Sequence, residues 1–229
     1  MFEKLKRFGR NFTQTTPFIL SNTVIFIPYL LFLGLTDSHN WLTILPFTLF
    51  YAFRMTGLFL VNSLRFGLDS YTLLMIALLI GGAGSLLGIL GVFYFPLFYF
   101  SSVLLGLSAA WLVPANTTVN FHEKTQGFIN MDGKKYLFAA IWLFLLYQAI
   151  ELPAPTQIAA SFTIYTLFYV MAYHTVSHYP RYELDFKDIK RNLVATRELV
   201  LFLIFFGLLF LLRNARLLFD ERLFDLAVY

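Results

Sequence analysis

Tyr71–Phe93 reads YTLLMIALLIGGAGSLLGILGVF, a run of 23 residues without a charged side chain. An α-helix rises about 1.5 Å per residue, so about 20 apolar residues cross a bilayer core of about 30 Å. The stretch therefore predicts a membrane-spanning helix. Its small residues lie four apart, as in Gly81 with Ser85 and Gly84 with Gly88, which predicts close approach of neighbouring helices.

Further apolar runs precede and follow this stretch. They are Pro17–Leu35, Trp41–Asn62, Leu97–Val119, Tyr136–Leu152, Gln157–Val176 and Glu198–Leu212. The chain is 59% hydrophobic with a mean hydropathy of +0.70, far above the range of soluble domains. We predict an all-α, polytopic membrane helix bundle of six to seven transmembrane helices. The last run is short, and it is either a tilted span or a segment lying on the cytoplasmic face.

The basic residues indicate the orientation of the spans. All but four of the 17 Lys and Arg residues lie in the N-terminal segment and in every second loop. The intervening loops, Thr36–Asn40, Tyr94–Pro96 and Pro153–Thr156, contain none. By the positive-inside rule the N-terminus is cytoplasmic and the first six spans form three hairpins. We expect an integral protein of a bacterial plasma membrane, whose formal charge of +4 faces anionic lipid and requires no nucleic acid.

The pattern divides the chain into three parts. Residues 1–176 are expected to form the six-span bundle, residues 177–197 a charged cytoplasmic loop, and residues 198–229 the seventh segment with an amphipathic tail. Most of the 28 Phe residues are expected to face lipid.

Two stretches carry a family resemblance. Ser63–Gly91, SLRFGLDSYTLLMIALLIGGAGSLLGILG, resembles the loop between spans two and three and the third span of the major facilitator superfamily. Gly106–Asn116, GLSAAWLVPAN, resembles the end of that family's fourth span. The chain then corresponds to the N-terminal six-span half plus the start of the seventh span. Of the family's loop motif Arg65 and Gly67 are present. Leu60, Leu64 and the pair Asp69-Ser70 replace its glycine, acidic residue and basic pair.

The resemblance implies a transporter, or half-transporter, that moves a small solute by alternating access and is not an enzyme. Such transporters hold their site between two pseudo-symmetric halves. A second half-transporter chain or a self-dimer would supply the other half, and a truncated chain is the third alternative. A different class of function also stays open: a non-transporting scaffold or accessory subunit that binds a partner membrane protein through its glycine strip and basic loops.

Five polar residues in or beside the spans are candidates for a solute cavity. They are Arg54, Asn22, Asn116, Gln148 and Glu151. A charge near the bilayer centre costs about 2.5–3.5 kcal/mol on insertion scales, so Arg54 either binds a solute or counter-ion in a cavity or extends toward the interface. Glu151 is either a protonatable cavity residue or a solvated interfacial carboxylate. The two asparagines either line the cavity or bond a neighbouring helix.

No catalytic or cofactor motif is present. The chain has no cysteine, and it lacks a phosphate-binding glycine loop followed by lysine. His174 and His178 are four residues apart and share a helix face, so they are weak candidates for a metal site. A zinc site usually needs more than two protein ligands. The sequence therefore predicts no metal, no cofactor and no catalytic residue.

Overall fold

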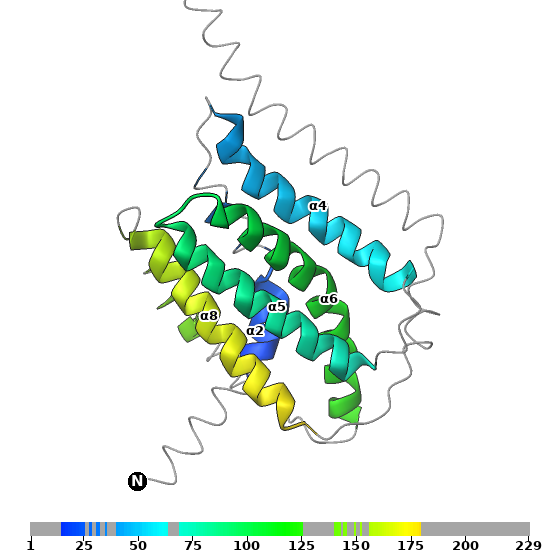
Figure 1. The fold of residues 1–229 in the computed structure, drawn as a ribbon. Helices are drawn as coiled ribbons and strands as arrows, with labels where there is room; N and C mark the ends of the chain where they lie inside the picture. Colours follow the sequence, from blue (N-terminus) through cyan, green and yellow to red (C-terminus); the bar gives the residue numbers. More distant parts are fainter. Residues whose placement is uncertain are drawn as a thin grey trace, which may run out of the picture. The chain divides into compact units, whose positions relative to one another are not determined.

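The computed structural model describes residues 15–25, 28, 31, 32, 35, 40–63, 69–125, 140–142, 144, 145, 149, 152 and 156–179. All of them belong to one compact unit of the chain, Met1–Phe186. Every regular element in this part is a helix (Figure 1). The helices are α2 (Thr16–Thr23), α4 (Trp41–Ser63), α5 (Ser70–Gly91), α6 (Leu97–Thr125) and α8 (Thr156–Ser177).

The predicted runs match these helices closely where they are described. α4, α5, α6 and α8 coincide with the second, third, fourth and sixth runs, and α2 opens the first. Within the described residues three helices are long and apolar enough to cross a membrane: Trp41–Leu60, Ser70–Gly91 and Leu97–His122. Tyr136–Leu152 is described only at scattered residues, and Glu198–Leu212 lies outside the described residues. The all-helical class is thus confirmed for this part, while the count of six to seven spans stays a prediction.

Asp69 determines where α5 begins. Its backbone is extended (φ −65°, ψ 159°) and its carboxylate accepts a hydrogen bond from the Thr72 amide at 2.5 Å. This satisfies one of the amide groups that have no partner in the first turn of a helix. The acidic residue that departs from the family's loop motif therefore has a local structural role.

Replacing Asp69 by alanine should remove this cap and destabilise the protein by about 1 kcal/mol. Asp69→Asn keeps a side-chain oxygen in the same place and should retain most of the stability. The apparent melting temperatures of the two variants in detergent check this. Equal losses in both would show that the negative charge, rather than the cap, is what the helix needs.

The described helices alternate in direction. α5 and α6 are antiparallel, because Gly91 meets Phe98 near the turn between them while the Ala77 carbonyl meets Ser108. α4 and α6 are parallel: the Leu42 carbonyl accepts a hydrogen bond from Tyr99 at 3.1 Å, and the Gly57 carbonyl accepts one from Trp111 at 3.0 Å. Helices two spans apart therefore run the same way, as consecutive hairpins require.

The glycines of α5 hold the aromatic rings of its neighbours. A Cβ on Gly81 or Gly88 would collide with Tyr169 or Phe162 of α8, and one on Gly91 would collide with Phe98 of α6. The glycines thus leave recesses, called glycine notches below, on two faces of α5, one that receives rings of α8 and one that receives a ring of α6. Figure 1 shows α5 lying between these helices. The prediction of close packing along the glycine strip is confirmed.

Those rings form the core. The expectation that most phenylalanines face lipid is wrong for a set of buried rings, of which Phe98 and Phe162 fill the space that Gly91 and Gly88 leave. These buried residues are Phe32, Phe47, Phe50, Phe98, Phe162 and Phe168. Phe32 connects α4 and α8 through ring contacts: its ring centroid is 6.1 Å from that of Phe50 and 6.0 Å from that of Phe162.

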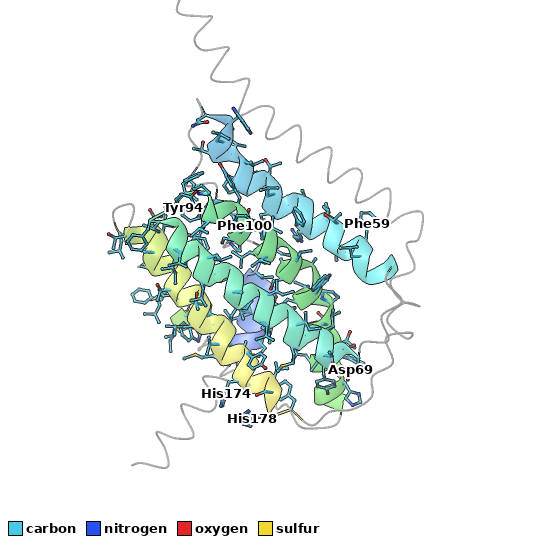
Figure 2. The ribbon with its side chains drawn as sticks, viewed as in Figure 1. Phe59, Asp69, Tyr94, Phe100, His174 and His178 are labelled. Carbon is cyan, nitrogen blue, oxygen red and sulfur yellow. The ribbon has the colours of Figure 1, made fainter. Side chains whose placement is uncertain are left out.

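Other aromatic side chains point outward. Trp41 at the start of α4 is 70% exposed, and Phe93 and Tyr94 in the turn after α5 are 85% and 63% exposed. Phe59, Tyr94 and Phe100 project from the helices in Figure 2. Exposed rings of this size at helix ends are typical of the interfacial belts of membrane proteins.

Candidate functional site

A buried hydrogen-bond chain joins α8, α6 and α5. The Ser108 hydroxyl lies 2.8 Å from the Ala77 carbonyl oxygen and 3.2 Å from the Tyr169 hydroxyl. A carbonyl can only accept, so Ser108 donates its one proton to Ala77 and the Tyr169 O–H donates to Ser108. Every polar atom of this hydrogen-bond network has a partner, and Tyr169 is held against Gly81, where the absence of a side chain leaves room for its ring.

One helical turn away, α8 has polar atoms that are not satisfied. Tyr165 is fully buried, and its ring stands edge-on to that of Tyr169 at a centroid distance of 5.4 Å. Its hydroxyl has Thr23 of α2 as a polar neighbour but does not reach hydrogen-bond geometry with it. Ser161, four residues earlier on the same face of α8, is also fully buried, and its hydroxyl has no hydrogen-bond partner among the described residues.

Ser161 differs from most of the hydroxyl residues around it. Most described serines and threonines in the helices donate to a carbonyl of the preceding turn. Thr163, Thr166 and Thr175 of the same helix do so, at 2.7, 2.8 and 2.9 Å. That bond is open to any helical serine or threonine. Ser161 instead presents its hydroxyl to the interior.

Asn116 of α6 is the third group of this kind. It is 2% exposed and lies two residues after Pro114, the proline within α6. Its amide nitrogen donates a long hydrogen bond, 3.4 Å, to the Pro17 carbonyl oxygen of α2. Its amide oxygen is buried and has no hydrogen-bond partner in the part of the chain that the structure describes.

These three residues, Asn116, Ser161 and Tyr165, are called the interior polar groups below. Asn116 meets α2 at Pro17, and Tyr165 meets it near Thr23, so α6 and α8 both present polar groups toward α2. Together they offer two hydroxyls and one amide oxygen, and none of the three carries a charge.

The interior polar groups lie at different depths. Ser108 of α6 is level with Tyr169 of α8. Asn116 lies eight residues after Ser108, whereas Tyr165 lies four residues before Tyr169. Asn116 and Tyr165 are therefore about 18 Å apart along the parallel helices. Each interior polar group can form a hydrogen bond with a small neutral molecule or with water at its own depth.

The structure does not bring the predicted cavity residues together. Arg54 is half-buried on α4 and has no ion-pair partner among the described residues. Asn22 is exposed, and its amide nitrogen donates to the Phe18 carbonyl of its own helix at 2.7 Å. Of the three predicted residues that the structure describes, Asn116 is the one that is buried with an unsatisfied atom. Gln148, Glu151, Arg65 and Gly67 lie outside the described residues.

The histidines lie at the end of α8. His174 and His178 are both exposed, with ring centroids 4.5 Å apart, and Figure 2 shows them together at the helix end. No cluster of three or more metal-ligating side chains occurs within the described ranges.

Ser161, Tyr165 and Tyr169 were not predicted as site residues. Their four-residue spacing was a usable signal, because it places three hydroxyl side chains on one face of the helix.

Comparison of the chain with models of known protein families, with curated proteins and with solved structures gives no match. The class rests on the fold itself: long apolar helices, an interior joined by glycine notches and exposed aromatic rings at helix ends are consistent with an integral membrane protein.

Proposed function

We propose that this chain is a membrane transporter, or one half of one, that moves a small solute by alternating access across a bacterial plasma membrane, with its N-terminus in the cytoplasm. The observation that carries the proposal is that each interior polar group buries one polar atom without a hydrogen-bond partner among the described residues, at different depths of the bundle. Leaving one buried donor or acceptor unsatisfied costs about 1–3 kcal/mol. A polar ligand bound there would offset that cost.

The packing around these groups suits such a role. Alternating access is largely the rocking of one rigid bundle against another around a fixed site. α5 is held against α6 and α8 by glycine notches, and α6 is held against α4 by a hydrogen bond from Trp111 to the Gly57 carbonyl. These contacts favour a bundle that moves as one body.

A scaffold would have to bind its partner protein through a surface other than the glycine strip of α5. The glycine strip of α5 is filled by Tyr169, Phe162, Leu105 and Phe98 of the same chain. A partner membrane protein would therefore bind elsewhere, for example through the basic loops.

Transport is tested with the full chain reconstituted in liposomes. Uptake of uncharged polyols, sugars and amides is followed by the osmotic shrinking and swelling of the vesicles. Light scattering in detergent, with the detergent mass subtracted, gives the number of chains in the active form. Solute-dependent swelling above that of protein-free liposomes supports the proposal. No flux of any solute, from a monomer or an oligomer, would overturn it in favour of a scaffold.

Tyr165→Phe should lower the rate of transport by roughly two- to tenfold, because it removes one hydrogen bond to the solute. The same change should leave the melting temperature unchanged or slightly raised, since the hydroxyl lies near Thr23 without reaching hydrogen-bond geometry and bonds no other described residue. Tyr169→Phe is the matched control: its hydroxyl donates to Ser108, so its loss should destabilise the protein by about 1 kcal/mol. If Tyr165→Phe destabilised the protein as much and transport were unaffected, the Tyr165 hydroxyl would be structural.

A further inference from the structure

Two imidazole rings lie side by side at the end of α8, His174 in its last turn and His178 directly after its last residue, Ser177. His174 and His178 are four residues apart, so their side chains rise from the same helix face, and their ring centroids are 4.5 Å apart with the planes inclined at 43°. Both residues are exposed. The rings are therefore accessible from solution and close enough to share one ion, whose bonds to nitrogen would be about 2.0–2.1 Å each.

Hydrogen bonds fix the tautomer of His178. Its Nδ1 lies 2.7 Å from the carbonyl oxygen of His174, which can only accept, so Nδ1 carries a proton. The Ser177 hydroxyl donates to the same carbonyl at 2.7 Å and lies 3.2 Å from that Nδ1. In the neutral ring the lone pair available to a metal is then on Nε2, on the side of the ring away from this carbonyl. Histidines that bind metals in proteins are usually held in this way, with the second nitrogen donating to a carbonyl.

The surroundings favour a cation. The C-terminal end of a helix has a partial negative charge from its unpaired carbonyl groups, and His174 lies in the last turn of α8. Within the described residues no side chain forms a hydrogen bond with the His174 ring, so neither of its nitrogens is occupied by one of them. The pair offers neutral nitrogen ligands, which suit copper, zinc and nickel better than magnesium or calcium.

We propose that His174 and His178 bind a divalent cation of the copper–zinc class at the end of α8, with water completing its coordination. The site is independent of the proposed transport, because it is exposed at the helix end and shares no residue with the interior polar groups. Holding both imidazoles on one ion requires that the last turn be helical, so binding and the order of this turn are linked.

The test uses the full chain in detergent with any affinity tag removed, because a polyhistidine tag would bind the same ions. Calorimetry measures Zn²⁺ binding, and electron paramagnetic resonance of bound Cu²⁺ reports nitrogen ligands through their hyperfine splitting. One equivalent of Zn²⁺ and a nitrogen-coordinated Cu²⁺ signal are expected. His174→Ala and His178→Ala should each weaken Zn²⁺ binding at least about tenfold, because two linked ligands bind together far better than one.

Two controls separate this site from general binding to histidine. His39→Ala removes another of the four histidines and should leave Zn²⁺ affinity unchanged. The double variant His174→Ala, Tyr173→His keeps the number of histidines but spaces them five apart, off the shared face, and should bind as weakly as His174→Ala. The proposal is overturned if Zn²⁺ does not bind at millimolar concentration, or if the spacing variant binds as tightly as the wild type.

Discussion

Replacing Gly106 by alanine should separate α4 from α6 and lower the apparent melting temperature by about 2–8 °C. A Cβ at this position would overlap the carbonyl oxygen of Phe50 and lie 3.1 Å from the amide nitrogen of Arg54. Both atoms belong to the backbone of α4, so no side-chain rotation can relieve the overlap. The helices must move apart, at a cost of about 1–3 kcal/mol or more that exceeds the roughly 1 kcal/mol gained in helix propensity.

Moving α4 and α6 apart at Gly106 would also weaken the other contacts between these two helices. One turn further along, Gly57 and Ala110 are so close that a Cβ on Gly57 would lie 2.7 Å from that of Ala110, and Trp111 donates to the Gly57 carbonyl. Among the described helices α4 packs mainly on α6. We therefore expect Gly106→Ala to broaden the size-exclusion peak in mild detergent as well. A variant as stable and as monodisperse as the wild type would show that α4 and α6 are not in contact at this crossing.

The position of Arg54 illustrates what the sequence could and could not provide. Its depth in the span followed directly from the residue count, and the helix was found where the apolar run predicts it. Its environment depends on where α6 crosses α4, and that crossing is set by Gly106, which is 52 positions away in the sequence. Periodicity within one helix contains no information about such a contact.

The same limit explains the phenylalanines. Composition alone suggests that a bulky apolar side chain in a membrane protein faces lipid. Phe162 is nevertheless fully buried, because Gly88 leaves a space in α5 that its ring fills. The glycine spacing predicted a close contact but not which neighbour makes it, and α5 in fact uses alternate glycines for α6 and α8.

The cavity residues predicted from the sequence are charged or amide side chains, since these are the most costly groups in a bilayer. Asn116 was found in this way. The hydroxyls of Ser161 and Tyr165 were not, because a tyrosine in a membrane protein is usually an interfacial anchor, and a serine hydroxyl in a helix usually bonds a carbonyl of the preceding turn. Whether it does so depends on the rotamer that the neighbouring helices permit, and the spacing alone does not determine this.

Gly81→Ala and Gly82→Ala should have opposite effects although they change adjacent residues in the same way. A Cβ on Gly81 would overlap the Tyr169 ring and lie 2.5 Å from the Ser108 hydroxyl oxygen. The variant should therefore lose about 2–3 kcal/mol of stability, and the hydrogen bonds that run from Tyr169 to Ala77 should break. Among the described residues a Cβ on Gly82 would meet only the Tyr169 Cβ, at an ordinary 3.5 Å, and the gain in helix propensity of up to about 1 kcal/mol should leave that variant as stable as the wild type or more so.

Melting temperatures in detergent check both effects, and a double-mutant cycle identifies the cause. If the Gly81 notch exists to receive the ring, Tyr169→Leu should destabilise the wild type more than it destabilises Gly81→Ala, because the smaller side chain relieves the overlap. Additive losses would mean that α5 and α8 do not meet at Gly81. The lipid-filled surroundings offer α8 apolar contacts as good as those of α5, so the close fit of rings into glycine notches is what holds this pair of helices together.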